Sequence, residues 1–377
     1  MKRITDAITA ILVCGFVLLI TAATALNIIK GGIALPGSGI SALLSDGSFV
    51  RSISSGFTDS FTERLEWISA DARIGSALGE SIVNGVYMTD ERLLDAENTP
   101  KKAFPGTASA VLGFAERYDG AVYFAAIPTS AGVYGELLPE YLSTLSTNTE
   151  KQVIDELYSQ LETGVRKIDA YNILKMVSDN YIYFRTDNKW TGYGAYCVYR
   201  TVVQKLGFQP IAYDKYTIEH LTDSFCGELY SKTRYMKCKP DIIDIYEYTG
   251  GAEVTECTAI DSDGREYSCE LYDRSAAQGE DMYNIYPGAV SAYFRIKTTV
   301  TNDRRLLVIG DDFAPAFLPF LVQHYSEIVM LSPEKISGGI TQYADPDDFE
   351  QTLFLFGADT LCQSGELVRL LDDVKEE

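Results

Sequence analysis

The stretch Leu306-Leu307-Val308-Ile309-Gly310-Asp311-Asp312-Phe313 decides how the fold of this chain is interpreted. Its four apolar residues predict a buried strand that ends at the glycine, and a pattern typical of a helix follows at residues 313–325. Ligands of open α/β sheets bind beside the carboxyl ends of the strands, so Asp311 and Asp312 are candidate site residues. Either aspartate could instead cap the helix, because Asp is a preferred residue at that position.

A second polar stretch, Arg185-Thr186-Asp187-Asn188-Lys189-Trp190-Thr191-Gly192, has a similar setting. It follows a predicted strand at residues 181–184 and precedes a predicted helix at residues 192–206. Asp187 or Thr191 could cap that helix, and Trp190 could anchor the core. Both stretches therefore place polar side chains where a predicted strand ends.

Strands and helices alternate along most of the chain. Further helices are predicted at residues 58–80, 107–118 and 148–164, and further strands at residues 86–88, 121–127, 305–309 and 327–331. This order predicts an α/β domain, residues 57–225 and 301–377, with a mostly parallel sheet between helices. Residues 226–300 alternate apolar and polar side chains and include the turn Asp263-Gly264, so they predict a β-rich insertion.

Composition and charge exclude some classes of partner. The 377 residues are 46% hydrophobic, enough for a substantial core, and the net charge is −21. We expect no nucleic-acid partner, because nucleic acids and anionic lipids are bound by clustered Lys and Arg. The two histidines and seven cysteines show no zinc-binding spacing, so neither a metal nor another cofactor is expected.

The N-terminus indicates export. Lys2 and Arg3 precede an uncharged run at residues 7–29, which is long enough to cross a bilayer. Residues 1–30 therefore predict a single-pass anchor, residues 31–56 a Gly/Ser-rich stalk, and the remainder an extracellular domain. Cleavage as a signal peptide after the small residues 23–25 is the alternative. Six cysteines would then lie outside, either disulfide-bonded or unpaired: Cys197, Cys226, Cys238, Cys257, Cys269 and Cys362.

Residues 183–196, Tyr-Phe-Arg-Thr-Asp-Asn-Lys-Trp-Thr-Gly-Tyr-Gly-Ala-Tyr, resemble the signature of the DHHW protein family, Tyr-Tyr-Arg-Thr-Asp-His-His-Trp-Thr with a downstream Gly-Ala. Residues 84–87, 127–130, 227–233 and 306–328 resemble other segments of that family. The family is similar to alginate O-acetylation proteins of the AlgX/AlgJ type. The resemblance implies an SGNH-hydrolase-like, flavodoxin-like fold and carbohydrate O-acetyltransferase or esterase chemistry.

The chain departs from the family at the positions that carry this chemistry. Asp312 stands in place of the nucleophilic serine, and Lys189 in place of the catalytic histidine. Asn188 replaces the other histidine of the signature, whereas Asp187 is retained. A Gly-Gly-Asn-like turn of the family falls on Gly288-Ala289-Val290. We expect Lys189 and Asp312 to form an ion pair where the family has its histidine and serine, because exchanging both partners of a polar pair can be tolerated.

Neither histidine of the chain replaces the lost base. His324 follows Asp312 by 12 residues, or about 18 Å on one helix, and is expected at the surface. His220 lies outside every motif.

These observations predict a degenerate catalytic site formed by Asp187, Lys189 and Asp312. The candidate binding residues beside it are Arg185, Trp190, Thr129, Ser130, Tyr230 and Asp311. The expected function is binding of a cell-surface glycan or an envelope protein during polysaccharide modification. The alternatives are an active O-acetyltransferase or esterase with a non-standard site, and a carboxylate site for a divalent metal or a phosphoryl group.

Overall fold

The computed structural model describes residues 14–27, 61, 63–96, 102–139, 150–161, 164–235, 237–279 and 281–372. The chain divides into two compact units, residues 1–80 and residues 81–377. In the first unit, residues 14–27 are helical and α4 spans Arg64–Ala77. None of the helices in the described ranges combines the length and the apolar composition that crossing a membrane requires. The predicted stalk, and the rest of the predicted anchor, lie outside the described residues.

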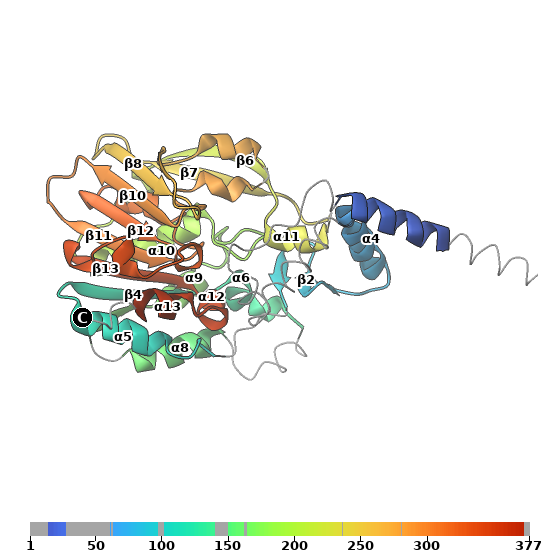
Figure 1. Cartoon of the computed structure of the whole chain (residues 1–377), viewed down its shortest axis with the longest axis horizontal. Coiled ribbons are helices and arrows are strands. Elements are labelled where there is room, and N and C mark those ends of the chain that lie inside the picture. Colours follow the sequence, from blue (N-terminus) through green and yellow to red (C-terminus); the bar gives the residue numbers. More distant parts are fainter. Residues whose placement is uncertain are drawn as a thin grey trace, which may run out of the picture. The chain divides into compact units, whose positions relative to one another are not determined.

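The second unit is built on an eight-stranded sheet (Figure 1). Five neighbouring strands are parallel: β5 (Val165–Ile168), β4 (Ala121–Ile127), β13 (Gln351–Gly357), β11 (Arg305–Gly310) and β12 (Glu327–Leu331). Three antiparallel strands continue the sheet beyond β12: β10 (Tyr293–Thr298), β8 (Val254–Ile260) and β9 (Glu266–Ser268). The apolar run at residues 306–309 therefore belongs to a central strand, β11.

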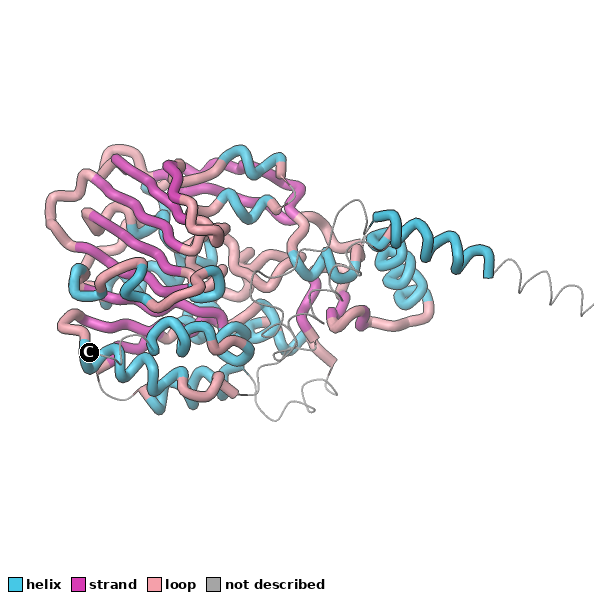
Figure 2. Tube along the Cα trace, viewed as in Figure 1, coloured by secondary structure: helices cyan, strands magenta, loops and turns pink. Residues whose placement is uncertain are grey.

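Helices cover both faces of the sheet (Figure 2). On one face, α9 (Ala170–Met176) and α10 (Gly192–Lys205) pack with Leu306 and Val308 of β11. On the other face, α5 (Thr107–Arg117), α8 (Glu150–Gln160) and α13 (Glu366–Asp372) pack with Leu307 and Ile309. Successive residues of a strand point to opposite faces, so a strand buried on both faces has a continuous apolar sequence. The predicted α/β fold with a parallel sheet between helices is confirmed.

Three strands of the predicted β-rich insertion join this sheet. Strands β8 to β10 belong to it, and the turn between β8 and β9 contains Gly264 with φ of +80°, as the Asp263-Gly264 pair predicts. A separate antiparallel ribbon is formed by β6 (Thr217–Phe225) and β7 (Asp241–Glu247). Smaller elements complete the unit: β1 (Ile82–Val83), β2 (Val86–Met88), β3 (Leu93–Asp95), α6 (Ser130–Val133), α11 (Glu228–Thr233) and α12 (Ala358–Gln363).

The predicted helix at residues 313–325 is wrong. The segment consists of turns and a short 3₁₀ helix, η5 (Leu318–Leu321). Pro315 and Pro319 supply no backbone N–H, and a proline ring inside an α-helix clashes with the carbonyl four residues earlier. The segment is almost entirely buried, so its apolar residues reflect burial on several sides and not one face of a helix.

The predicted strand at residues 181–184 is also wrong. Tyr183 and Trp190 form an isolated bridge instead of a strand. The N–H of Phe184 donates to the carbonyl of Lys189 at 3.2 Å, and the N–H of Thr191 donates to that of Ile182 at 2.9 Å. Residues 184–189 therefore form a closed loop, and Thr191 caps α10 by accepting a hydrogen bond from the Gly194 N–H.

Candidate functional site

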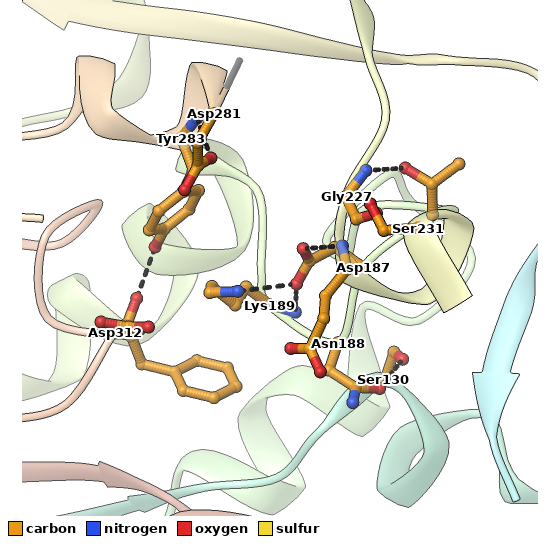
Figure 3. Close-up of polar contacts among 12 residues, drawn as sticks. Ser130, Asp187, Asn188, Lys189, Gly227, Ser231, Asp281, Tyr283 and Asp312 are labelled. Carbon is orange, nitrogen blue, oxygen red and sulfur yellow. Dashed lines mark hydrogen bonds and ion pairs between the residues drawn. The ribbon is translucent and has the colours of Figure 1, made fainter. Parts of the chain in front are cut away.

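A cleft of about 380 Å³ brings together the family positions in residues 81–377 (Figure 3). Asp312 follows the carboxyl end of β11, as the prediction for ligand sites of α/β sheets requires. The lining residues come from four segments: Asp187 and Lys189; Phe225, Cys226, Gly227, Glu228 and Ser231; Asp281, Tyr283, Asn284 and Ala289; and Asp312.

Asp241, at the start of β7, fixes the loop that carries Asp187 and Lys189. Its buried carboxylate accepts hydrogen bonds from the N–H groups of Arg185 and Thr186, each at 2.8 Å. The hydroxyls of Thr186 and Tyr181 also donate to it. Asp241 was not predicted as a site residue, because it is more than 50 residues from the loop and belongs to none of the motifs.

Asp187 is a buried hydrogen-bond acceptor that joins two of the segments lining the cleft. Its carboxylate accepts from Lys189 Nζ at 3.0 Å, from the Lys189 N–H at 3.0 Å and from the Glu228 N–H at 2.9 Å. Burial alone would raise the pKa of Asp187, but the charge of Lys189 and the backbone hydrogen bonds outweigh it and lower that pKa. Gly227 allows the close approach, since a Cβ atom there would overlap the carboxylate.

Lys189 is held as a cation. Its side chain is 16% exposed, and its ammonium group lies 5.1 Å from the centre of the Tyr283 ring. Burial alone would lower the pKa of Lys189, but the negative charges of Asp187 and Asp312 raise it above its ordinary value. Figure 3 shows Lys189 between these two aspartates. A protonated lysine cannot accept the proton of a nucleophile.

The predicted ion pair between Lys189 and Asp312 is wrong. Asp312 Oδ1 pairs with Lys335 Nζ at 2.8 Å, and Lys335 also donates to the Ala289 carbonyl at 2.8 Å. The hydroxyl of Tyr283 donates to the Asp312 carbonyl at 2.6 Å. One signal in the sequence could have indicated Lys335, because it follows the predicted strand that becomes β12. Strands β11 and β12 are parallel neighbours, so their carboxyl ends meet at one edge of the sheet.

Four of the predicted binding residues lie in the core and not at a binding surface. Trp190 is fully buried, and its Nε1 donates to the Phe313 carbonyl at 3.0 Å. Ser130 is also fully buried, and its Oγ donates to Asn188 Oδ1 at 3.3 Å. Asp311 accepts from the N–H groups of Phe313 at 3.0 Å and Gly357 at 2.7 Å, which joins the ends of β11 and β13. Thr129, the fourth, is bonded to Glu150 as described below.

The other two predicted binding residues are more accessible but do not line the cleft. Arg185 lies 3.8 Å from Asp241 Oδ1 and 4.5 Å from the centre of the Tyr181 ring. Tyr230 is half-buried, with Arg234 over its ring at 5.5 Å.

Neither histidine supplies a base to the cleft. His324 is buried, contrary to prediction, and its Nε2 lies 2.8 Å from the Tyr199 hydroxyl. Burial lowers the pKa of His324 to about 4, so it is neutral at neutral pH. His220 is exposed on β6 and pairs with Asp244 of β7.

Glu150 is a buried acid beside Thr129. Its carboxylate accepts from the Thr129 N–H at 2.8 Å and from the Thr129 hydroxyl at 2.5 Å. Burial raises the pKa of Glu150 from 4.5 to about 7, although both hydrogen bonds act in the opposite direction. A raised pKa means that the folded state binds this proton more tightly than the unfolded state. The contribution of this proton to the stability of the folded state is fully present below pH 4.5, and it is lost as the pH rises through about 7.

Glu150→Gln is therefore expected to change the pH dependence of stability. Between about pH 4.5 and about pH 8, the free energy of unfolding of the variant should rise relative to wild type by on the order of 3 kcal/mol. Urea denaturation at both pH values measures this difference. The control is Glu156→Gln, an exposed position of the same helix, which should leave the profile unchanged. Parallel pH profiles of stability for Glu150→Gln and wild type would contradict a raised pKa at Glu150.

The described ranges contain no group of three or more His, Cys, Asp or Glu side chains arranged to hold a metal ion. Asp187 and Asp311 instead direct their oxygens to N–H groups of neighbouring loops. The alternative of a divalent-metal site thus gains no support from these carboxylates.

The sequence matches the family described as "DHHW protein" over residues 110–331, more than half of the chain, and the chain therefore belongs to this family. A DHHW family protein from Eubacterium siraeum is similar in structure, with a TM-score of 0.63 and 20% identity, over 76% of this chain and 94% of that one. Bacillus cereus PatB1 with a sulfonyl adduct gives a TM-score of 0.63 and 18% identity, over 75% and 97%. The O-acetyltransferase domain of Pseudomonas putida AlgJ gives 0.44 and 12%, over 77% and 99%. A comparison with curated proteins found no match.

Proposed function

We propose that this protein is a catalytically degenerate member of the DHHW family that binds a glycan or an envelope protein during cell-surface polysaccharide modification. We further propose that residues 7–29 anchor it in the membrane, with the α/β domain outside the cell. The proposal depends on the chemistry of the cleft, on the family resemblance and on the charge pattern of the N-terminus.

One observation carries the catalytic part of the proposal. The nucleophile and base positions hold Asp312 and Lys189, and each is engaged in an ion pair with a different partner. Acyl transfer by a serine requires a neighbouring base that can take its proton. Lys189 is already protonated and cannot act as the base. Asp312 presents a carboxylate paired with Lys335 in place of a serine hydroxyl. The site therefore lacks both the nucleophile and the base that acyl transfer by a serine requires.

An active enzyme with a non-standard site is the competing proposal, and Ser231 is its best nucleophile. Ser231 lines the cleft, and its hydroxyl donates to the Gly227 carbonyl at 3.2 Å. Lys189, the residue at the base position, donates to Asp187 and is held as a cation. Among the described residues, the hydroxyl of Ser231 thus donates to a backbone carbonyl and not to a side chain that would activate it.

Restoring both lost residues is the test. The purified wild-type protein should hydrolyse p-nitrophenyl acetate no faster than the buffer does. The double variant Asp312→Ser/Lys189→His should hydrolyse it about 100-fold or more faster than wild type, because it regains a nucleophile, a base and the retained Asp187. Each single variant should stay at the background rate, since either change alone restores only half of the pair.

Two controls make this test decisive. Phenylmethylsulfonyl fluoride should modify the double variant at position 312 and leave the wild type unmodified, as peptide mass spectrometry would show. Wild-type hydrolysis that disappears in Ser231→Ala or Asp312→Asn would establish the active alternative and end the proposal.

Binding and location have separate measurements. Calorimetry with soluble cell-surface polysaccharide should show binding that Ser231→Trp, a bulky change in the cleft lining, removes. The protein should remain in the membrane fraction after alkaline carbonate extraction, and protease added to intact cells should cleave it. A carbonate-soluble protein, or one protected in intact cells, would contradict the location.

A further inference from the structure

Two cysteines stand opposite each other where β8 meets β9. The register of this antiparallel pair sets Thr258 against Ser268, so the next pair along the ladder is Cys257 and Cys269. The Cys269 N–H donates to the Cys257 carbonyl at 3.1 Å, which confirms that the pairing continues to these two residues. Both thiols are free in this structure.

The backbone register of the pair is compatible with a disulfide. Hydrogen-bonded pairs of antiparallel strands have Cα atoms about 5.5 Å apart. Disulfides occur at Cα separations of about 4.4–6.8 Å. Side chains of directly opposed residues point to the same face of the sheet, and Cys257 and Cys269 pack against the same core cluster. We propose that Cys257 and Cys269 form an intramolecular disulfide that fastens strand β9 to β8.

The position gives this bond a structural role. β9 has only three residues, all exposed, and it is the edge strand of the sheet. The chain after Cys269 leads to Tyr283, whose hydroxyl holds the Asp312 carbonyl in the cleft. The bond thus anchors the start of the segment that supplies one wall of the cleft.

The oxidation requires a two-electron oxidant, and a low-molecular-weight disulfide such as glutathione disulfide supplies it. The thiolate of Cys269, which is half-buried, attacks this disulfide and releases one glutathione thiolate. Cys257 then attacks the mixed disulfide and releases the second glutathione. The protein loses two protons and two electrons, and glutathione disulfide gains them as two thiols. Burial raises the pKa of both thiols, that of Cys257 to about 12, so the exchange should become faster as the pH rises.

Mass spectrometry of the full chain tests the bond directly and needs no variant. The protein is equilibrated with glutathione disulfide, its remaining thiols are blocked with N-ethylmaleimide, and it is digested with trypsin and Glu-C without reduction. Cleavage after Glu256, Arg265, Glu266 and Glu270 should yield residues 257–265 joined to residues 267–270. Dithiothreitol should separate them.

The same treatment should raise Tm by about 5 °C, because the bond closes a short loop of the unfolded chain. Cys269→Ser should abolish both the linked peptide and the rise, whereas Cys197→Ser, a cysteine of α10, should retain both. Blocked thiols at Cys257 and Cys269 after oxidation, or a link from either to another cysteine such as Cys226 or Cys238, would overturn the proposal. The readout is independent of esterase activity, so its failure is distinct from failure of the proposed function.

Discussion

Asp187→Ala is expected to lower the free energy of unfolding by about 3–5 kcal/mol, because it leaves Lys189 as an unpaired buried charge. The change also removes the acceptor for the N–H groups of Lys189 and Glu228, which join the loop to the start of α11. Equilibrium urea denaturation at neutral pH measures the loss. The double variant Asp187→Ala/Lys189→Met should regain part of the lost stability, because the unpaired ammonium charge of Lys189 is also removed.

The other ion pair of the cleft provides the matched control. Asp312 is 48% exposed and pairs with Lys335, which is 24% exposed, so solvent screens their attraction. Asp312→Ala should therefore lower the free energy of unfolding by no more than about 1 kcal/mol. Equal losses for Asp187→Ala and Asp312→Ala would show that burial does not distinguish the two pairs, contrary to the structure.

Asp241→Ala is expected to destabilise the protein by about 4 kcal/mol or more, the second large effect. The buried carboxylate accepts four hydrogen bonds from Tyr181, Arg185 and Thr186, and every one of these donors would lose its partner. Asp241→Asn should also be destabilising, because its amide group places N–H donors against N–H donors. Denaturation curves of both variants measure the effect.

Asp223→Ala, an exposed aspartate of the partner strand β6, is the control for Asp241 and should change stability by less than about 0.5 kcal/mol. If Asp241→Ala were equally mild, the loop with Asp187 would be held by other contacts. The restored variant Asp312→Ser/Lys189→His would then tolerate the loss of Asp241 without losing activity.

Much of the eight-stranded sheet was predictable because its signal is local. Strands β4 and β12 have the predicted bounds, and β11 was evident as a continuous apolar run, whereas β5 was not predicted. A strand that is buried on both faces is apolar at every position, whatever its neighbours are. The alternation of strands and helices then restricts the fold to few arrangements. The retained Asp187 and the replaced positions Lys189 and Asp312 were equally visible, since the surrounding signature lies within one short segment.

The segments around residues 181–184 and 313–325 were not predictable in the same way. Apolar residues predict burial, but they do not distinguish a strand or helix from a loop packed on several sides. At residues 313–325 the sequence did contain the overlooked signal, because Pro315 and Pro319 exclude a regular helix; tertiary packing takes the place of helical hydrogen bonds. Around Tyr183, the loop is closed by two backbone hydrogen bonds and by Asp241.

The sequence by itself determined the class of fold and the family, and the family resemblance implied that Asp312 and Lys189 replace a serine and a histidine. Only the tertiary structure decided how the replacements are used: Asp312 pairs with Lys335 and Lys189 with Asp187. The physical reason is that an ion pair depends on distance in space, and the carboxyl ends of β11 and β12 bring residues 312 and 335 together. Composition, spacing and motifs do not specify the distance between Asp312 and Lys335, because it is set by the alignment of the parallel strands.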